Sequence, residues 1–587
     1  MGPETEYQHR TDSVETKLSL LKRARESGDL DLAMSLAESI KHTLSFERQS
    51  RDEQESVIDA ATFQIVEKLP SEWAEWANGW SFFKVVEIRE QSGLARKNEP
   101  VDIRLSFAAD QVTDVQREIR VAKACEGGGI LRHVPSQVYG AKRIGSEVHC
   151  NLVFMADSAE RGVSHFVILY GNPLAELPNY STDLKVSGEG YALDIENEHF
   201  AARLSRQMGQ LERLNYKWLH GLELFAGGEG HGEPPNIDWA HDYLASNGFQ
   251  KFRVTNWASC PNYEVVRGPL CVKVRRWGFP HSPAHPLFTP SRMHIDVTYT
   301  FYAGQPWFRK VGSMDMVQDF ELHYLRDDEW VFSGYSFDES LWMDREGRLH
   351  EGSVPPEHQD DLWGVGFYHG KSRQMFFALW LEHYAENFDG LHHAGAPELD
   401  YRQHGQLWSR WAARDNPQFK EGASLNQHNA YLTGMFLEET GAADIELLRQ
   451  KLLHPLTAGP GELPDDIEVK PGEALARPGE TESTAPLKNE IWAALREVPD
   501  DMFYKMDANV ADMGYIYDVR VRGHAVHILM TMPHHGRPKY DYLGVPIRER
   551  LLQIKSVREV FVEFTWQPAW DASRLNDAGR KAMGIGS

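Results

Sequence analysis

The chain has 587 residues and a formal net charge of -24, and 41% of its residues are hydrophobic. This length predicts several domains with real cores, while the negative charge argues against nucleic acid, whose phosphates need a basic surface. No apolar run has the length of a membrane span, and the four scattered cysteines form no CxxC pair, so we expect a reduced, cytoplasmic protein.

Five segments follow one another along the chain. Residues 1–66 carry apolar side chains at helical spacing and predict a charged helical hairpin. Short alternating runs over 67–180 predict a small barrel-like β-domain, and longer runs over 181–455 predict a large antiparallel supersandwich. A linker rich in Pro, Gly and Glu covers 456–486, and mixed patterns over 487–587 predict a small α/β domain. The expected fold class is mainly β.

Three phrases near the end of the sequence carry a resemblance: DANVADMGYIYDVRV, LMTMPHHGRP and FTWQPAWDASRLNDAGRKAMG. This segment resembles the metal–sulfur cluster assembly family, of the type found in phenylacetate-oxygenase assembly proteins. Where that family usually carries a cysteine after a Thr-x-Pro turn, this chain has His534 and His535, so the soft thiolate ligand of a cluster is missing. The resemblance therefore implies a helper or docking domain rather than cluster transfer.

A second resemblance covers residues 95 to about 330. Its phrases include EPVDIRLSFAADQVTDVQREIRV, YGNPLAELPNY, IENEHFAARLSRQMGQLERL and VTYTFYAGQPWFRK. The region resembles the β-domains of exo-acting rhamnogalacturonan lyases, in which a small barrel-like domain precedes a supersandwich common in carbohydrate-active enzymes. That family's α/α-barrel has no counterpart after residue 455, so degradation of a polymer is not implied.

Histidines are concentrated in the predicted sandwich. Twelve of the 26 lie between His281 and His428, together with seven tryptophans. Flat aromatic faces beside hydrogen-bonding groups suit sugar rings, although large aromatic residues also fill sandwich cores. The pattern predicts a polar groove on one surface of the sandwich.

The stretch LHHAGAPELDYRQHGQLWSRW contains the groups needed for β-elimination from a uronate. Its two adjacent histidines would face opposite ways on a strand, so at most one can serve a groove. We expect His404 or His393 to take the proton at C5. Tyr401 would protonate the leaving oxygen, and Arg410 would hold the carboxylate. This hypothesis requires no cofactor. A solvated loop whose histidines only form hydrogen bonds is an equally good explanation.

Five further side chains are candidates for contact with a sugar-like substrate: Trp408, Tyr368, His369, Arg373 and His428. They lie in polar blocks of the same region. The alternative for each is a role in turn hydrogen bonding or in the core.

A metal site is the alternative to the elimination site. His281 and His285 are four residues apart, but the prolines around them forbid a helix, so they could converge only from a loop. His294 and Asp296 are two residues apart on a predicted strand and would share one face. These ligand types suit a divalent ion such as Zn, Mn, Ni or Fe.

Three functions follow from these patterns. The first is an intracellular lyase that eliminates from a sugar acid or glycoside fragment, and the second is a metal-dependent hydrolase or lyase. The third is a non-catalytic, ligand-binding assembly scaffold. We expect a small sugar-like substrate, and a second copy or a protein partner held through the N-terminal helices or the C-terminal domain. Nucleic acid and membrane are not expected partners.

Overall fold

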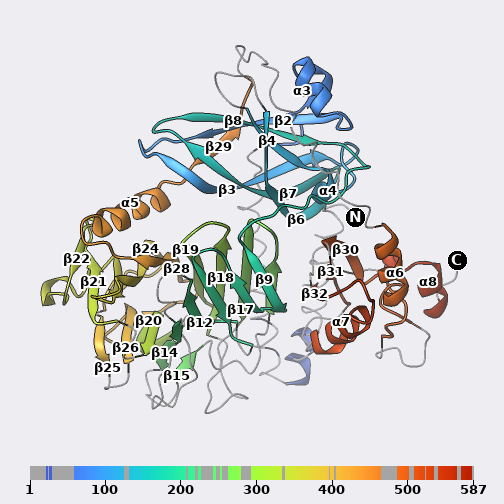
Figure 1. Cartoon of the computed structure of the whole chain (residues 1–587). Coiled ribbons are helices and arrows are strands. Elements are labelled where there is room, and N and C mark those ends of the chain that lie inside the picture. The colour runs from blue at the N-terminus through green and yellow to red at the C-terminus, as the bar shows by residue number, and fades with distance from the viewer. Residues whose placement is uncertain are drawn as a thin grey trace. The chain divides into compact units, whose positions relative to one another are not determined.

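A computed structural model of the chain forms two compact units, shown in Figure 1. It describes residues 21–23, 25–28, 33, 37, 58–124, 131–206, 209–217, 223–225, 242–245, 251–253, 262–278, 292–333, 337–395, 397–401, 405–463, 485–500, 508–522, 524–533, 540–564, 570 and 572–584. Unit 1 contains the described residues of Arg48–Ser181 and Leu456–Ser587, and unit 2 contains those of Lys17–Glu47 and Thr182–Pro455. Most sheets are antiparallel, which confirms the mainly β class.

Unit 1 begins with two facing sheets. The first has the order β1-β2-β8-β4-β5 and the second the order β3-β7-β6. The strands are β1 (Gln64–Ile65), β2 (Phe82–Arg89), β3 (Arg96–Ala108), β4 (Arg120–Ala124), β5 (Leu131–Val134), β6 (Ser136–Ile144), β7 (Glu147–Ser158) and β8 (Val163–Tyr170). Two short helices accompany them, α3 (Ser71–Trp76) and α4 (Val115–Glu118).

A shared apolar core joins these two sheets. Val86 and Phe166 come from the first sheet, and Leu105 and Leu152 from the second. The strand β29 (Thr457–Pro460) pairs with β2, so the start of the segment predicted as a linker completes this domain. Residues 464–484 of that segment lie outside the described residues, as does most of the predicted N-terminal hairpin, of which 21–23 and 25–27 are helical.

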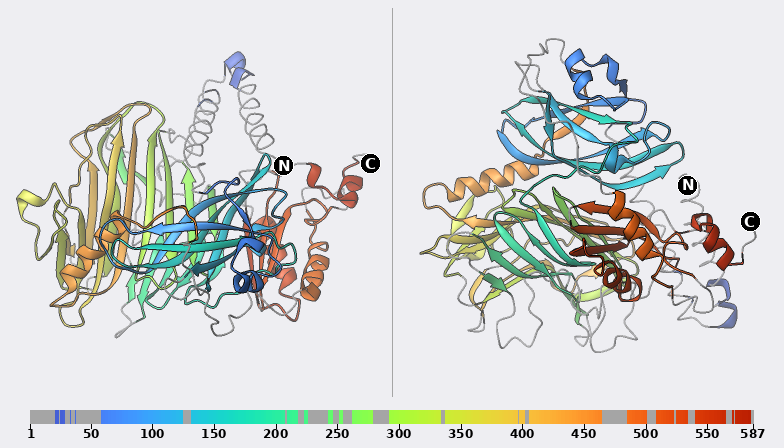
Figure 2. Two further views of the ribbon diagram at one scale, coloured as in Figure 1. Left: turned by 90° about the horizontal axis from the view of Figure 1, so that it is seen from above. Right: turned by 45° about the vertical axis from the view of Figure 1, so that its right-hand side comes forward.

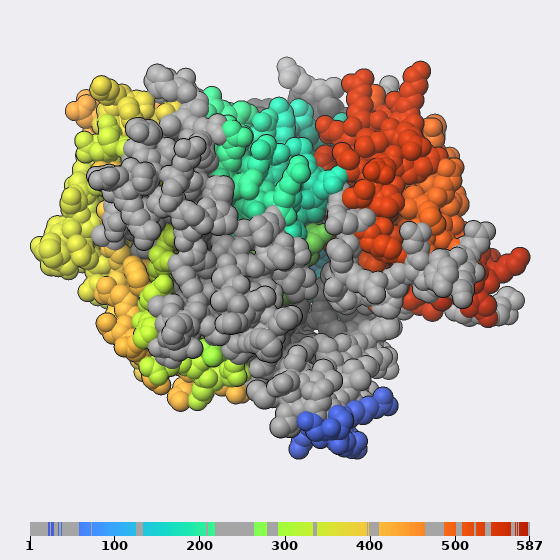
Figure 3. All heavy atoms as spheres, turned by 90° about the horizontal axis from the view of Figure 1, so that it is seen from below, coloured from blue at the N-terminus to red at the C-terminus, as the bar shows by residue number. Residues whose placement is uncertain are grey.

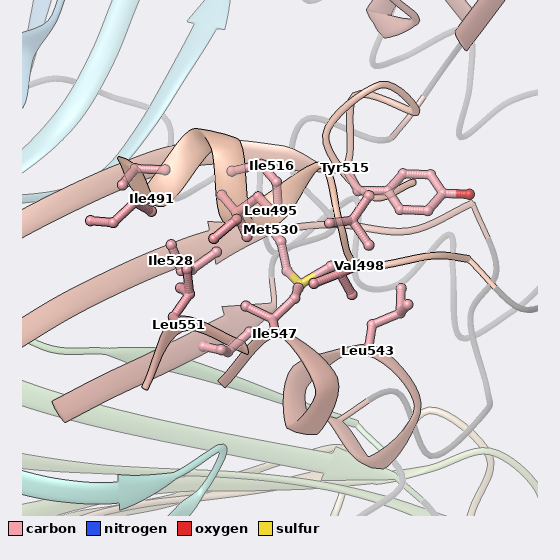
Figure 4. Packing of buried hydrophobic residues seen from close by; sticks show 14 of the residues in the cluster. Ile491, Leu495, Val498, Tyr515, Ile516, Ile528, Met530, Leu543, Ile547 and Leu551 are labelled. Atoms are coloured by element: carbon pink, nitrogen blue, oxygen red, sulfur yellow. The ribbon is translucent and has the colours of Figure 1, made fainter. Parts of the chain in front are cut away.

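The end of unit 1 is the predicted small α/β domain. Its sheet has the order β30-β31-β32, formed by β30 (Ile516–Arg522), β31 (Ala525–Met530) and β32 (Glu559–Phe564), with β31 and β32 parallel. The helices are α6 (Ala485–Leu495), α7 (Val545–Leu551) and α8 (Asp577–Ala582). Apolar side chains of α6 and α7 interleave with those of the strands, among them Leu495, Ile528 and Ile547 (Figure 4). This segment therefore has a hydrophobic core of its own.

Unit 2 is built on a sheet of nine strands, in the order β16-β17-β18-β19-β28-β24-β23-β21-β22. The strands are β16 (Asn262–Val266), β17 (Cys271–Gly278), β18 (Met293–Tyr302), β19 (Trp307–Met316), β21 (Glu339–Met343), β22 (Leu349–Glu351), β23 (Gly364–Tyr368), β24 (Gln374–Glu386) and β28 (Ser424–Met435). The long strands of this unit run side by side in the left view of Figure 2.

Two smaller sheets belong to the same unit. One contains β9 (Lys185–Glu189), β10 (Ala192–Glu196), β11 (Phe200–Leu204), β12 (Leu211–Tyr216) and β13 (Glu223–Phe225). The other contains β14 (Asp242–Ala245), β15 (Lys251–Arg253), β20 (Phe320–Ser333), β25 (Glu398–Tyr401), β26 (Gly405–Ala413) and β27 (Gln418–Phe419). The helix α5 (Gly441–Leu453) follows β28 in the chain.

Both smaller sheets pack on the same face of the large sheet. Phe200 of β11 contacts Phe301 and Phe308 of the large sheet. Leu325 of β20 joins the core that contains Met314 and other residues of β18, β19 and β28. We call this covered side the inner face. It gives unit 2 the two-layered arrangement of a large sandwich.

Two buried ion pairs lie at the inner face, and the first of them links the two layers. Lys310 Nζ of β19 lies 2.6 Å from Asp328 Oδ1 of β20, and Tyr431 of β28 donates to Asp328 Oδ2 at 2.9 Å. The second pair joins Asp327 of β20 to Arg410 of β26. All four charged side chains are at most 3% exposed, so their opposite charges compensate one another inside the protein.

β-Bulges explain why so many polar side chains reach this interior. Adjacent strand residues normally face opposite ways, but the pairing of β20 with β26 shifts between Arg326 and Asp328. Asp327 is the extra residue, which allows Asp327 and Asp328 both to meet cations of the interior. A second shift lies between Trp380 and Glu382 of β24. It brings Trp380 and His383 to the same inner face.

We expect Asp328→Asn to destabilise unit 2 by about 3–5 kcal/mol, because the substitution leaves the Lys310 ammonium buried without its counter-ion. Urea unfolding followed by tryptophan fluorescence measures the change. The matched control is Lys420→Met, at the Lys420–Asp319 pair whose side chains are 70% and 60% exposed. An equal loss of stability in the two variants would contradict the structural role of the Lys310–Asp328 pair.

Candidate functional site

The side of the large sheet opposite the inner face, here called the outer face, carries a patch of polar side chains. Strand alternation places them there, because their neighbours Met314, Leu425 and Ala385 pack into the inner core. Inner positions are buried, whereas most outer positions are partly exposed. The outer-face cluster consists of Asp296, Arg309, Ser313, Asp315, Glu382, Tyr384, Glu386, Ser424, Asn426 and His428. The described atoms of residues 262–455 appear in green, yellow and orange in Figure 3.

His428 lies near the middle of this cluster. It pairs with Val311 of β19 on one side and with Glu382 of β24 on the other. Burial of the ring, together with the charge of Arg309, lowers the pKa of His428 to about 4. Its Nε2 has no hydrogen-bond partner among the described residues. At neutral pH the imidazole is therefore unprotonated and able to accept a proton.

Arg309 and Tyr384 flank His428 diagonally, from β19 and from β24. Diagonal neighbours in a sheet are separated by about 7–8 Å, within reach of long side chains. Arg309 stacks over Trp307, 5.1 Å from the ring centroid, and forms no ion pair within the described chain. The Tyr384 side chain is 46% exposed, and burial and the carboxylates of Glu382 and Glu386 raise its pKa.

Carboxylates dominate the other end of the cluster. Ser424 donates to Asp315 Oδ1 at 2.8 Å, and burial together with the charges of Asp296 and Glu386 raises the pKa of Asp315. Asp296 is held by Arg275, whose Nη2 lies 2.6 Å from Asp296 Oδ2. The outer face is thus acidic at one end and carries a neutral base near its middle, with a cation diagonally beside that base. This arrangement can bind a polar ligand and move protons on it.

The predicted elimination residues fall in a different place. Arg410 is 1% exposed and is engaged by Asp327 and by the carbonyl oxygen of His392. His393 stacks on Trp363 at 4.3 Å, and burial together with Arg410 lowers the pKa of His393 to about 3. The structure brings His393 and Arg410 together at the interior of the sandwich, away from the outer-face cluster. His404 lies outside the described residues, and Tyr401 is described only as part of β25.

The predicted substrate contacts are divided between two places. Tyr368, His369 and Arg373 lie around one hairpin, where Tyr368 donates to Glu351 at 2.7 Å and Arg373 stacks over Tyr368 at 4.6 Å. His428 belongs instead to the outer-face cluster. Trp408 lies on β26, and its side chain is outside the described part of the structure.

The predicted metal ligands are also divided. His281 and His285 lie outside the described residues. His294 and Asp296 share the outer face of β18, as their spacing predicted, with His294 5% exposed. Within the described ranges, no group of three His, Cys, Asp or Glu side chains is placed to hold a metal ion.

Sequence reasoning missed Arg309, Asp315 and Tyr384. Each lies on a strand whose alternate residues are apolar or buried, so each could have been assigned to an exposed face. The missing information was which strands are neighbours. Only the order β19-β28-β24 brings Arg309 and Tyr384 to the two sides of His428.

The C-terminal domain carries a smaller polar group. Tyr515 and Tyr542 donate to the two oxygens of Asp500 at 2.7 and 2.6 Å. The buried Oγ1 of Thr531, three residues before His534 in the sequence, has no partner among the described residues. His534 and His535 lie outside those residues.

The C-terminal region is similar to known proteins. Residues 488–563 match the family described as iron-sulfur cluster assembly protein. An Fe–S protein maturation auxiliary factor of Bacillus subtilis is 26% identical over 100 residues, which are 17% of this chain and 95% of that protein. A factor of the same description from Porphyromonas gingivalis is 26% identical over 99 residues, covering 17% and 91% of the two chains.

A larger part of the chain is similar to a solved structure. The protein in glycosyl hydrolase family 38 from Enterococcus faecalis superimposes with a TM-score of 0.42 and 11% identity. The superposition covers 73% of this chain and 52% of that protein, so the chain spans about half of its length.

The family match corrects the predicted cofactors. No cofactor was expected for elimination, and a divalent metal was the alternative. The expectation that no cofactor is involved is contradicted, because the C-terminal region matches a family described as iron-sulfur cluster assembly protein. None of the helices in the described ranges has the length and apolar character needed to span a bilayer.

We expect unit 2 to lose stability as the pH falls from about 6.5 towards 4. The pKa of His428 is about 4 in the folded protein and 6.5 without its environment, so the unfolded state binds more protons in this window. His428→Gln should make the free energy of unfolding depend less steeply on pH, by at most about 1.4 kcal/mol per pH unit. Urea unfolding at several pH values measures it, with Asn426→Ala as the non-titrating control. An unchanged slope would contradict the low pKa.

Proposed function

We propose that the chain is an auxiliary factor in iron–sulfur protein maturation and acts in this role through its C-terminal domain. The observation that carries the proposal is the extent of the match, since the domain corresponds to 95% of the length of the Bacillus subtilis maturation factor. The domain also has its own hydrophobic core. It is therefore suited to act as a module attached to a larger body.

The residues of this domain bear on how it would act. All four cysteines of the chain, Cys125, Cys150, Cys260 and Cys271, precede it. Thiolates are the usual ligands of iron–sulfur clusters, so the domain's own residues do not fit a cluster held by cysteines. We infer that the cluster is carried by a partner protein, to which the domain binds. His534 and His535, which follow the Thr-x-Pro turn, are the candidates for contact with that partner.

A bacterial host that lacks its own maturation auxiliary factor provides the test. Expression of the full chain should restore the activity of an iron–sulfur enzyme such as aconitase, measured against an enzyme without a cluster. The double substitution H534A/H535A should abolish the rescue because it removes the proposed partner contacts. His524→Ala, an exposed histidine of the same domain, is the control and should leave the rescue unchanged. Failure of the unmodified chain to rescue would overturn the proposal.

A second function is proposed for unit 2, on the basis of the outer-face cluster. We infer that it catalyses elimination on a sugar acid or glycoside fragment. The supporting observation is the unprotonated His428 between Arg309 and Tyr384. These are the base, cation and acid that elimination requires.

The reaction would proceed as follows. The His428 imidazole accepts the proton from C5 of the uronate, and Arg309 stabilises the negative charge that develops on the carboxylate. A double bond forms between C4 and C5 while the bond from C4 to the leaving oxygen breaks. Tyr384 donates its phenolic proton to that oxygen, so that no oxidant or reductant is consumed. The raised pKa of Tyr384 keeps this proton in place at neutral pH.

Ultraviolet absorbance of unsaturated uronates tests this second function. The purified full chain should generate this absorbance from oligouronides. His428→Gln should reduce the rate by about 100-fold or more, because general base catalysis typically contributes that much. The control is His350→Gln, on β22 at the far edge of the same sheet. No product from the unmodified chain would exclude elimination, and product formation unaffected by His428→Gln would exclude this site.

A further inference from the structure

Four polar atoms inside unit 2 have no hydrogen-bond partner among the described residues. They are Asp327 Oδ1, Arg410 Nε, His383 Nδ1 and His393 Nε2. Asp327, Arg410 and His383 are 2%, 1% and 8% exposed. Native interiors seldom leave such atoms unsatisfied, because each costs about 1–3 kcal/mol when it is removed from water without a partner.

The four atoms belong to one neighbourhood. Asp327 and Arg410 form an ion pair, and Arg410 Nη2 donates to the carbonyl oxygen of His392 at 3.0 Å, next to His393. The rings of His383 and His393 stack with centroids 5.2 Å apart. Trp380 connects the groups, since its ring lies 6.0 Å from the Arg410 guanidinium and 5.7 Å from His383. The site is therefore assembled from β20, β24, β26 and the segment after β24.

The hydrogen-bonding capacity of the site is defined by its neighbours. Asn429 Nδ2 donates to Gln427 at 2.8 Å, so Asn429 Oδ1 is an acceptor. His383 Nε2, 2.7 Å from that oxygen, must then carry the proton. His383 Nδ1 is left as an acceptor, as is Asp327 Oδ1, whereas Arg410 Nε is a donor. A group that both donates and accepts is needed to satisfy them.

The charge of the site indicates a neutral occupant. Asp327 and Asp328 are balanced by Arg410 and Lys310. Burial and Arg410 lower the pKa of both His383 and His393, so both rings are neutral at pH 7. A shared metal ion does not fit, because the two rings are within 9° of parallel and their in-plane lone pairs do not converge.

We propose that these atoms form a buried binding site for the hydroxyl group of a neutral molecule, either water or a small polyol. The hydroxyl oxygen accepts from Arg410 Nε. The hydroxyl hydrogen is donated to Asp327 Oδ1 or His383 Nδ1, and water can satisfy both acceptors at once. This site is separate from the outer-face cluster and does not depend on either proposed function.

Oxygen-17 relaxation dispersion on the full chain tests the proposal by counting long-lived internal waters. His383→Phe preserves a ring that can stack on His393 but removes Nδ1, and it should lose at least one such water. The control is His350→Phe, because His350 likewise stacks on an aromatic ring, Trp342, at 4.2 Å. It should retain the number found in the unmodified chain.

Glycerol titration of the same samples distinguishes the two occupants. If the site binds polyols, glycerol should displace the long-lived water of the unmodified chain. If the site binds only water, the long-lived water should remain when glycerol is added. Either result supports the proposal if His383→Phe abolishes the signal. The proposal is overturned if His383→Phe retains all long-lived waters and binds glycerol no differently from the unmodified chain.

Discussion

The side-chain alternation of β28 is the constraint on which unit 2 depends. Gln427, Asn429 and Tyr431 point to the inner face and join the buried polar network, while Asn426 and His428 point to the outer face. A shift of register by one residue would exchange the two sets. It would bury His428 against the second layer and expose Tyr431, which donates a hydrogen bond to Asp328. The strand therefore fixes the interior and the outer-face cluster together.

The two buried ion pairs, Lys310–Asp328 and Asp327–Arg410, contribute more to fixing how the strands align than to the free energy of unfolding. Placing two carboxylates and two cations in the core costs desolvation that their attraction roughly offsets, so the net gain is small. Any other pairing of β20 with β26 would leave Asp327 or Arg410 without its partner. Such an unpaired buried charge is strongly unfavourable, which excludes alternative arrangements of these two strands. The polar interior thus specifies how these two strands pair.

Much of the fold could be predicted from sequence, because long alternating runs and family-like phrases identify β-domains and the C-terminal α/β domain. The site could not be predicted to the same degree. In SLNQHNAYLTGM, polar residues occupy both parities, so the run does not reveal which side of β28 is covered. The bulges at Asp327 and near Leu381 change parity without any marker in the sequence. The stretch LHHAGAPELDYRQHGQLWSRW was interpreted as a groove, but its Arg410 points into an ion-paired interior.

One chain joins a domain that matches the iron–sulfur cluster assembly family and a sandwich for whose outer face we propose acid–base chemistry. The central claim for the sandwich is that ligands bind at the outer face, around His428. Hydrogen–deuterium exchange of the full chain with and without oligouronides tests it most directly. We predict slower exchange in β19, β24 and β28 when the ligand is present. Slower exchange confined to other strands, or none at saturating ligand, would contradict the claim.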